Sequence, residues 1–293
     1  MSMNKLDEGK IKRNRYITRD RSIALMTALG FIVNSLTSSG AITKVENNGT
    51  IETNGNVTNI WADKVNGQNA FNHFQEFKQD ANQIANMHFK GKNGSNEADR
   101  LFNFVNSRIE VNGTVNAIKN NKIGGDLYFL SSDGMVVGNT GTINTGSLHV
   151  ITPSKTAYAD AIQKAGAGVV AEGIVPDAKG QIKIPLNPEG TIVVRGQVNA
   201  VDEIGLYAAN IKIGNVKSEL VKDTDYTPKV NLKTGVTDFS NLVNIQGIDS
   251  GLKGEQLQAT KIGNGNIIIS MEEPLGEKKR AKPKVVLNDK NIC

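Results

Sequence analysis

The sequence is poor in cysteine and in aromatic residues. Its 293 residues include a single cysteine, Cys293, and aromatic residues make up only 5% of the chain. One cysteine excludes an intramolecular disulfide, so the core and the backbone hydrogen bonds have to supply the stability. A lone cysteine at the last position also offers no pattern typical of a catalytic nucleophile.

Motifs for catalysis and for metal binding are also absent. The three histidines, His73, His88 and His149, lie far apart in the sequence and have no metal-ligand spacing. The chain has neither a G-x-S-x-G nucleophile motif nor a phosphate-binding loop. We therefore expect no cofactor, no metal and no enzymatic activity. A polysaccharide lyase is the remaining enzymatic alternative, with Arg195, Asp202 and Glu203 as its loose candidate set.

The net charge of +5 does not indicate a basic binding face. Residues 1–22 hold seven Lys/Arg against three Asp/Glu, and residues 272–293 hold six against four. These ends carry +4 and +2, so residues 23–271 carry −1. Because nucleic-acid binding needs a folded basic face, we expect no nucleic-acid partner.

Glycine and asparagine are abundant, with 30 and 34 residues. Both form turns readily and helices poorly, which favours an all-β chain with many corners. The clearest example is Gly124–Pro153, where three short apolar runs are separated by small polar or glycine-containing spacers. The runs read as buried strands, and they comprise Leu127–Leu130, Met135–Val137 and Leu148–Ile151. Strands joined by corners without helices predict a β-solenoid.

The N-terminus has the pattern of a secretory signal peptide. A basic leader over residues 1–22 precedes the apolar run Ile23–Val33, which is too short to span a bilayer as a helix. Ser39 and Ala41 supply small residues at the two positions that determine cleavage. We therefore predict a signal peptide with a long basic n-region over residues 1–41 and export through the Sec machinery.

Gly125–Gly138, GDLYFLSSDGMVVG, resembles the G-x-x-x-L-x-NPNG-I-x-x-G signature of the two-partner-secretion domain in the filamentous haemagglutinin family. Ser131, Ser132 and Asp133 stand where the family has Asn, Pro, Asn, and Gly134 and Met135 match the family's next two residues, Gly and then Ile or Met. Leu101–Ala117 resembles the strand that precedes this turn in the family. GSLHVITP and GLYAANI resemble most closely the leukotoxin-type filamentous adhesins of anaerobic Gram-negative bacteria.

Asn69–Phe89 also resembles a stretch of the two-partner-secretion domain, and it has two possible interpretations. Phe71, Phe74 and Phe77 recur every three residues, which by periodicity alone predicts an amphipathic helix. The resemblance instead implies irregular strands beneath an N-terminal cap. We follow the resemblance, and in either case the phenylalanines belong to the core.

The resemblance implies an all-β, right-handed parallel β-helix with an N-terminal cap and extra-helical hairpins. It implies a β-helix secretion domain over residues 42–271, followed by a charged linker, or the start of a downstream region, over 272–293. Its partner would be the periplasmic domains of an outer-membrane transporter, and its location the cell surface or the medium. It also implies contact with host cell surfaces through the full-length protein. Residues implied in transporter recognition are Phe71, Phe74, Phe77, Ser131, Ser132, Asp133, Gly134, Met135 and Gly138.

Further elements follow from the residues themselves. Lys155–Ala165 predicts one short helix inside an excursion, Ser154–Pro188, and Asp223–Asp238 predicts a surface hairpin. Later strands are expected at Thr191–Val194, Gln197–Val201, Gly205–Ile213, Leu242–Ile248, Leu257–Ile262 and Asn266–Met271. Asparagines near these strands can stack as hydrogen-bonded ladders or lie in solvated turns.

The function expected is that of the N-terminal secretion domain of a large exported adhesin or leukotoxin. For the phenylalanines and Leu127–Leu130, packing is the better explanation. For the Ser131–Gly134 turn, expected to be exposed, recognition and packing remain equally open. The alternative function is a self-contained surface adhesin or glycan-binding rod.

Overall fold

The computed structural model divides the chain into two compact units, residues 1–39 and residues 40–293. It describes residues 40–46, 48–94, 96–214, 231–236, 239, 266–270 and 285–286. Two predictions fall outside these residues: the signal peptide up to Ser39, and the strands Leu242–Ile248 and Leu257–Ile262. The Asp223–Asp238 hairpin is described only at residues 231–236. There Leu232–Lys233 pairs in parallel with Gln197–Ala200 and Leu232 is buried, so the prediction of a surface hairpin is wrong for this part. No described helix combines the length and the apolar character needed to span a bilayer.

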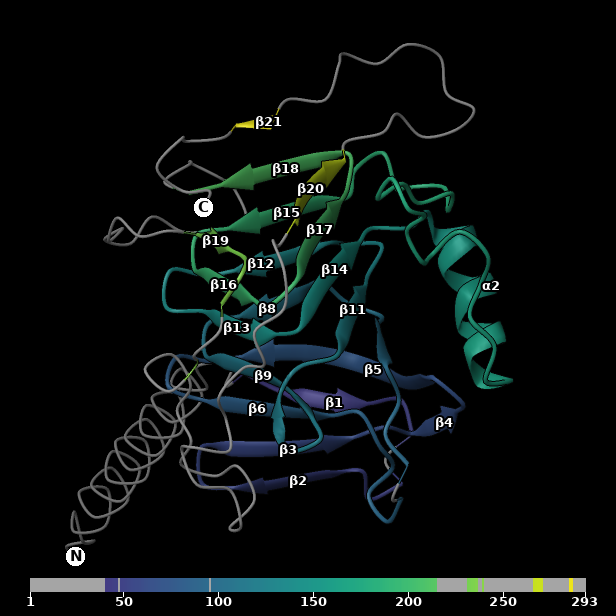
Figure 1. Ribbon diagram of the computed structural model, residues 1–293, viewed down its shortest axis with the longest axis vertical. Helices are drawn as coiled ribbons and strands as arrows, with labels where there is room; N and C mark the ends of the chain where they lie inside the picture. Colours follow the sequence, from purple (N-terminus) through teal and green to yellow (C-terminus); the bar gives the residue numbers. More distant parts are fainter. Residues whose placement is uncertain are drawn as a thin grey trace, which may run out of the picture. The chain divides into compact units, whose positions relative to one another are not determined.

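The described residues from Gly40 onward are mostly β-structure, built from long ladders of parallel strands (Figure 1). The first ladder contains β5 (Asn69–Gln79), β7 (Arg100–Val105), β11 (Asp126–Leu130), β14 (Ser147–Ile151), β17 (Glu203–Tyr207) and β20 (Asn266–Ser270). The second continues from the end of β5 through β8 (Ile109–Val111), β12 (Met135–Val137), β15 (Thr191–Val194), β18 (Asn210–Ile213) and β21 (Val285–Val286). The third contains β3 (Val57–Trp61), β6 (Ile84–His88), β9 (Thr114–Lys119), β13 (Thr142–Thr145), β16 (Gln197–Ala200) and β19 (Leu232–Lys233).

The chain visits these ladders in a fixed order. Strands β7, β8 and β9 belong to the first, second and third ladders, and β11, β12 and β13 repeat that order one rung further on. Strands β14, β15, β16 and then β17, β18, β19 repeat it again. Parallel pairing in register places equivalent residues above one another, as for Leu101, Leu127 and Leu148.

Antiparallel pairs are concentrated in the N-terminal part. Strands β1 (Ile42–Lys44) and β4 (Lys64–Asn66) pair with β5, and β2 (Ile51–Asn54) pairs with β3. A further hairpin joins β9 to β10 (Lys122–Ile123). Strands β1, β2 and β4 cover one side of the first rungs, where a stack of parallel strands would otherwise present unpaired backbone groups.

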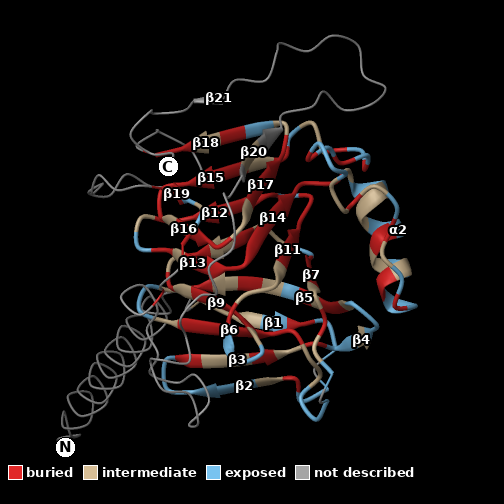
Figure 2. Ribbon diagram, viewed as in Figure 1, coloured by how far each residue is buried: buried red, intermediate tan, exposed pale blue. Residues whose placement is uncertain are grey.

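Alternating side chains of the ladders form an inner apolar core, and Figure 2 shows the buried residues gathered along the stacked strands. The core includes Leu127, Phe129, Met135, Val137 and Ile143, all at most 1% exposed. Because side chains alternate along a strand, the neighbours of Leu127 and Phe129 point to the other face. Tyr128 and Leu130 accordingly belong to a separate outer cluster.

The outer cluster lies between the first ladder and an excursion of the chain. The helix α2 (Lys155–Gly166) begins after Ser154, whose Oγ accepts a hydrogen bond from the Ala157 N–H. It buries Ala161 and Ala165 against the aromatic side of the ladder. The excursion closes where the Ser154 N–H donates to the Pro185 carbonyl, at 2.7 Å. The predicted helix and excursion are confirmed.

A row of asparagines runs through the third ladder. Each side-chain amide donates from Nδ2 to Oδ1 of the preceding rung, over 2.9–3.1 Å, from Asn86 to Asn59, Asn116 to Asn86, Asn144 to Asn116, and Asn199 to Asn144. Asn116, Asn144 and Asn199 are fully buried. The stacked-ladder interpretation is therefore correct for Asn199, whereas Asn210 is exposed at the start of β18.

The strand prediction Gly205–Ile213 is wrong in one respect. Two strands, β17 and β18, replace the single one, and Ala208–Ala209 lie between them. The two strands pair with different ladders, so the chain has to turn between them. Alanine at this corner gives no turn signal of the kind that glycine or asparagine would.

Candidate functional site

The three phenylalanines lie on β5, a single strand of eleven residues. Strand structure over this stretch agrees with the resemblance and contradicts the helical periodicity. Strand β5 pairs with β7 up to Phe74 and with β8 from Lys78, and its register with β1 shifts beside Phe74. This irregularity lets Phe74 and Phe77 both enter the inner core, with ring centroids 5.3 Å apart, while Phe71 packs in the outer cluster.

The turn Ser131–Gly134 joins β11 to β12 and is held from several sides. The Ser131 Oγ donates to the Ser107 carbonyl at 2.7 Å, and the Gly134 N–H donates to the Ser131 carbonyl at 3.1 Å. Asn187 donates from Nδ2 to the Ser132 carbonyl at 2.7 Å. The expectation of an exposed turn is wrong for three of its four residues, because only Asp133 is exposed.

The glycines of the motif are required by close approach of neighbouring groups. Gly134 has φ +88°, and a Cβ there would lie 1.9 Å from the Thr191 carbonyl oxygen of the next rung. At Gly138 a Cβ would lie 1.9 Å from Oδ1 of Asn112. Met135 is fully buried in the inner core. These three matches to the family signature therefore maintain the corner and its packing.

A cleft of about 510 Å³ opens beside the turn. Ser132 and Asp133 line it together with residues from β5, from the β7–β8 connection, from β8 and from both ends of the excursion. The Ser132 hydroxyl is buried and has no hydrogen-bond partner among the described residues. The Tyr158 side chain of α2 lies near Asp133, and its pKa is raised by burial and by the Asp133 carboxylate.

The charges around this cleft are only partly paired. Lys78 and Arg108 both pair with Glu110, at 3.6 and 3.0 Å. Asp133 and Glu189 are exposed on the rim, and neither forms an ion pair with another described residue. The cleft thus presents the Asp133 and Glu189 carboxylates, together with the exposed Lys155, beside a buried hydroxyl. Sequence reasoning found Asp133 but missed Glu189 and Arg108, because only the stacking of rungs brings them beside the turn.

A second, smaller pocket of about 290 Å³ lies between the N-terminal strands and α2. Its apolar side includes Phe71, Phe104 and Ile162, and its polar side includes Asp63 and His73. The Lys64 Nζ donates to the Gly166 carbonyl at 2.7 Å, which joins β4 to the end of α2 beside this pocket. Phe71 thus contributes to a pocket wall as well as to the outer cluster.

The residues considered for catalysis do not form one site. Arg195 is 2% exposed and lies at the corner after β15, where its backbone N–H donates to the Val137 carbonyl. Asp202 lies at a different corner, before β17, where its backbone N–H donates to the Gly146 carbonyl. Burial raises the pKa of both Asp202 and Glu203. Among the described residues there is no group of three or more His, Cys, Asp or Glu side chains that could hold a metal ion.

Ala41, one of the two predicted cleavage residues, lies within the described residues. Its carbonyl accepts a hydrogen bond from the Lys78 N–H at 2.8 Å, and the preceding Gly40 N–H donates to Asp80 Oδ2 at 2.6 Å. The segment that begins at Gly40 is therefore bound along the end of β5.

Searches against family models, curated proteins and solved structures find no match to this chain.

Proposed function

We propose that this chain is the secretion domain of an exported adhesin or leukotoxin and that an outer-membrane transporter of the two-partner type recognises it. Its fold would be a right-handed parallel β-helix with β1, β2 and β4 as the N-terminal cap and β9–β10 as an extra-helical hairpin. The repeated order of the three ladders supports this architecture. Such a stack can fold from one end, rung by rung, as the chain emerges from a pore.

The observation that carries the proposal is the position of the Ser131–Gly134 turn. Its buried residues fix the corner, while Asp133 alone is exposed at the rim of the 510 Å³ cleft. A partner could therefore contact Asp133 without disturbing the hydrogen bonds of Ser131. In this proposal, recognition depends on Asp133 and folding depends on its buried neighbours in the same motif.

The test is export from cells with and without a co-expressed cognate transporter, comparing the native chain with Asp133→Asn. We expect transporter-dependent export that falls roughly tenfold in the variant, which corresponds to about 1.4 kcal/mol of lost binding. Glu172→Gln is the matched control, because Glu172 is exposed, lies outside the cleft and loses the same charge. Both purified variants should keep the native free energy of unfolding within about 0.5 kcal/mol.

Export that does not depend on the transporter would overturn the proposal. The second candidate, a glycan-binding rod, is favoured by the 290 Å³ pocket with its aromatic and polar walls. Binding of the purified chain to a glycan array, lost on Phe104→Ala, would support that alternative.

A further inference from the structure

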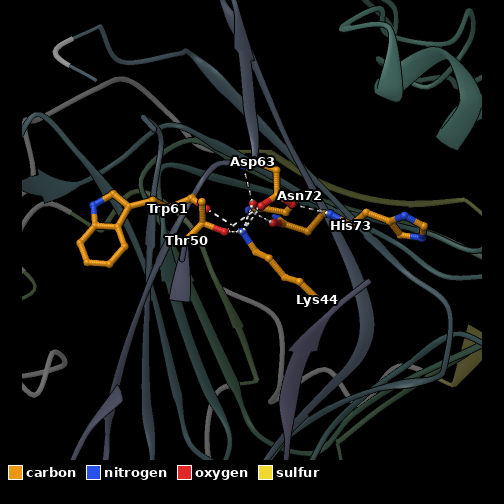
Figure 3. A network of polar contacts seen from close by, with 7 residues as sticks. Lys44, Thr50, Trp61, Asp63, Asn72 and His73 are labelled. Carbon is orange, nitrogen blue, oxygen red and sulfur yellow. Dashed lines mark hydrogen bonds and ion pairs between the residues drawn. The ribbon is translucent and has the colours of Figure 1, made fainter. Parts of the chain in front are cut away.

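The side chain of Lys44 is completely buried, at 0% exposure. Figure 3 shows its amine at the centre of a network of polar contacts. Four oxygens surround its Nζ: Asp63 Oδ1 at 2.6 Å, the Trp61 carbonyl at 2.7 Å, and Thr50 Oγ1 and Asn72 Oδ1 at 2.8 Å. Two of these oxygens belong to groups with their own chemistry, a carboxylate and a carboxamide. Neither the packing of the fold nor the proposed function requires this combination.

A lysine amine beside a carboxamide is a nucleophile beside an electrophile. The distance from Nζ to Oδ1 of Asn72 places the carbonyl carbon Cγ only one C=O bond, about 1.2 Å, beyond the contacted oxygen. Positioning of reacting groups at such short range replaces a bimolecular encounter. Asn72 is 1% exposed, so water has little access to the carbon that would be attacked.

The surrounding groups match the needs of that reaction. Asp63 Oδ1 contacts Nζ and can accept its proton. The backbone N–H of Asp63 donates to Asn72 Oδ1 at 3.2 Å, where negative charge would develop. Asn72 Nδ2, the leaving group, donates to Asn103 Oδ1 at 2.9 Å, which holds the carboxamide in one orientation.

The environment also favours the reactive form of the amine. Burial lowers the pKa of Lys44, and the Asp63 carboxylate opposes this shift. The Phe74 ring lies 5.6 Å from Nζ and favours the charged amine, so it opposes the effect of burial as Asp63 does.

From this geometry we infer that Lys44 and Asn72 form an intramolecular isopeptide bond, with Asp63 carrying the protons. Nζ forms a bond to Cγ of Asn72, and the Cγ–Nδ2 bond breaks. Nζ begins as an ammonium and ends as an amide N–H, so it releases two protons. Asp63 passes both to Nδ2, which leaves as an ammonium ion. The reaction needs no oxidant or other reagent, and it joins β1 to β5 covalently.

The first experiment is intact mass spectrometry of the purified full chain under denaturing conditions. The expected mass is lower than the sequence mass by one ammonia molecule, and protease digestion should yield a joined pair of peptides that contain Lys44 and Asn72. The folded native chain keeping its full sequence mass on prolonged incubation would overturn the inference. So would an ammonia loss mapped to an Asn-Gly pair such as Asn54-Gly55, where succinimides form.

Variants separate the chemistry from folding. Asp63→Asn keeps the size of the side chain, and it should retain the native circular dichroism while keeping the full sequence mass. Asn72→Asp should lose water instead of ammonia and so reach the same final mass as the native chain. Lys64→Arg is the matched control, since Lys64 is a nearby exposed lysine, and it should still lose one ammonia. An uncrosslinked, well-folded Asn72→Asp chain would contradict the assignment of Asn72 as the acceptor.

Discussion

The first ladder has two faces that differ in composition and in what covers them. Its inner face is mostly aliphatic and is closed by the other ladders, so the coil itself buries it. Its outer face carries a stack of rings, Phe71, Phe102, Tyr128 and His149, with successive centroids 5.6, 4.5 and 4.4 Å apart. An excursion of the chain covers this stack. The inner face therefore defines the fold, whereas the outer face depends on an added segment.

Phe129 and Tyr128 are adjacent on β11 and point to opposite faces, so they test this difference directly. Phe129→Ala should give the larger effect, a loss of about 4 kcal/mol in the free energy of unfolding, because the inner core is closed on all sides and cannot collapse onto the cavity. Chemical denaturation measures it. A loss below about 2 kcal/mol would mean that the inner core is not the more rigid of the two.

Tyr128→Ala should lower the free energy of unfolding by less, about 2 kcal/mol, because the excursion can move inward and fill part of the cavity. The distinguishing readout is limited proteolysis. Cleavage within residues 166–184 should accelerate in Tyr128→Ala and stay at the native rate in Phe129→Ala. Equal cleavage rates in the two variants would show that the packing of the excursion does not depend on the outer ring stack.

The smallest expected effect is a pH dependence that involves His149 on the outer face. Burial and the Arg100 charge lower the pKa of His149 to about 4, although Glu203 Oε1 lies 3.8 Å from its Nδ1. The unfolded chain takes up this proton first, so stability should fall as the pH drops from about 6.5 towards 4, by on the order of 1 kcal/mol over the first pH unit. Denaturation at several pH values should show this loss in the native chain and a smaller one in His149→Gln.

Local patterns in the sequence predicted the parts of the fold that depend on neighbouring residues. The runs at Leu127–Leu130, Met135–Val137 and Leu148–Ile151 became β11, β12 and β14, each within one residue of its predicted ends. Helix α2 follows its alanine spacing and its Ser154 cap. These elements carry their own turn residues and periodicity, so the surrounding structure agrees with the local signal.

Predictions failed where spacing along the chain does not determine spacing between rungs. The burial of Ser131 and Ser132 depends on Ser107 and Asn187, which lie in other rungs. The Lys44 site combines residues from β1, from β5 and from the segment just before β4. A single lysine in a short strand does not predict such a site. Charged rims such as Asp133 with Glu189 are assembled in the same way, by register between distant segments.

The asparagine row described in the third ladder has a direction. The four amides from Asn86 to Asn199 each donate towards the N-terminal side, so the side-chain dipoles add head to tail, as peptide dipoles do along a helix. The negative end is Oδ1 of Asn199, a buried acceptor with no hydrogen-bond partner among the described residues. Reversing one amide inside the row would put donor against donor and acceptor against acceptor. The polarity set by the first amide therefore fixes the orientation of every later amide in the row.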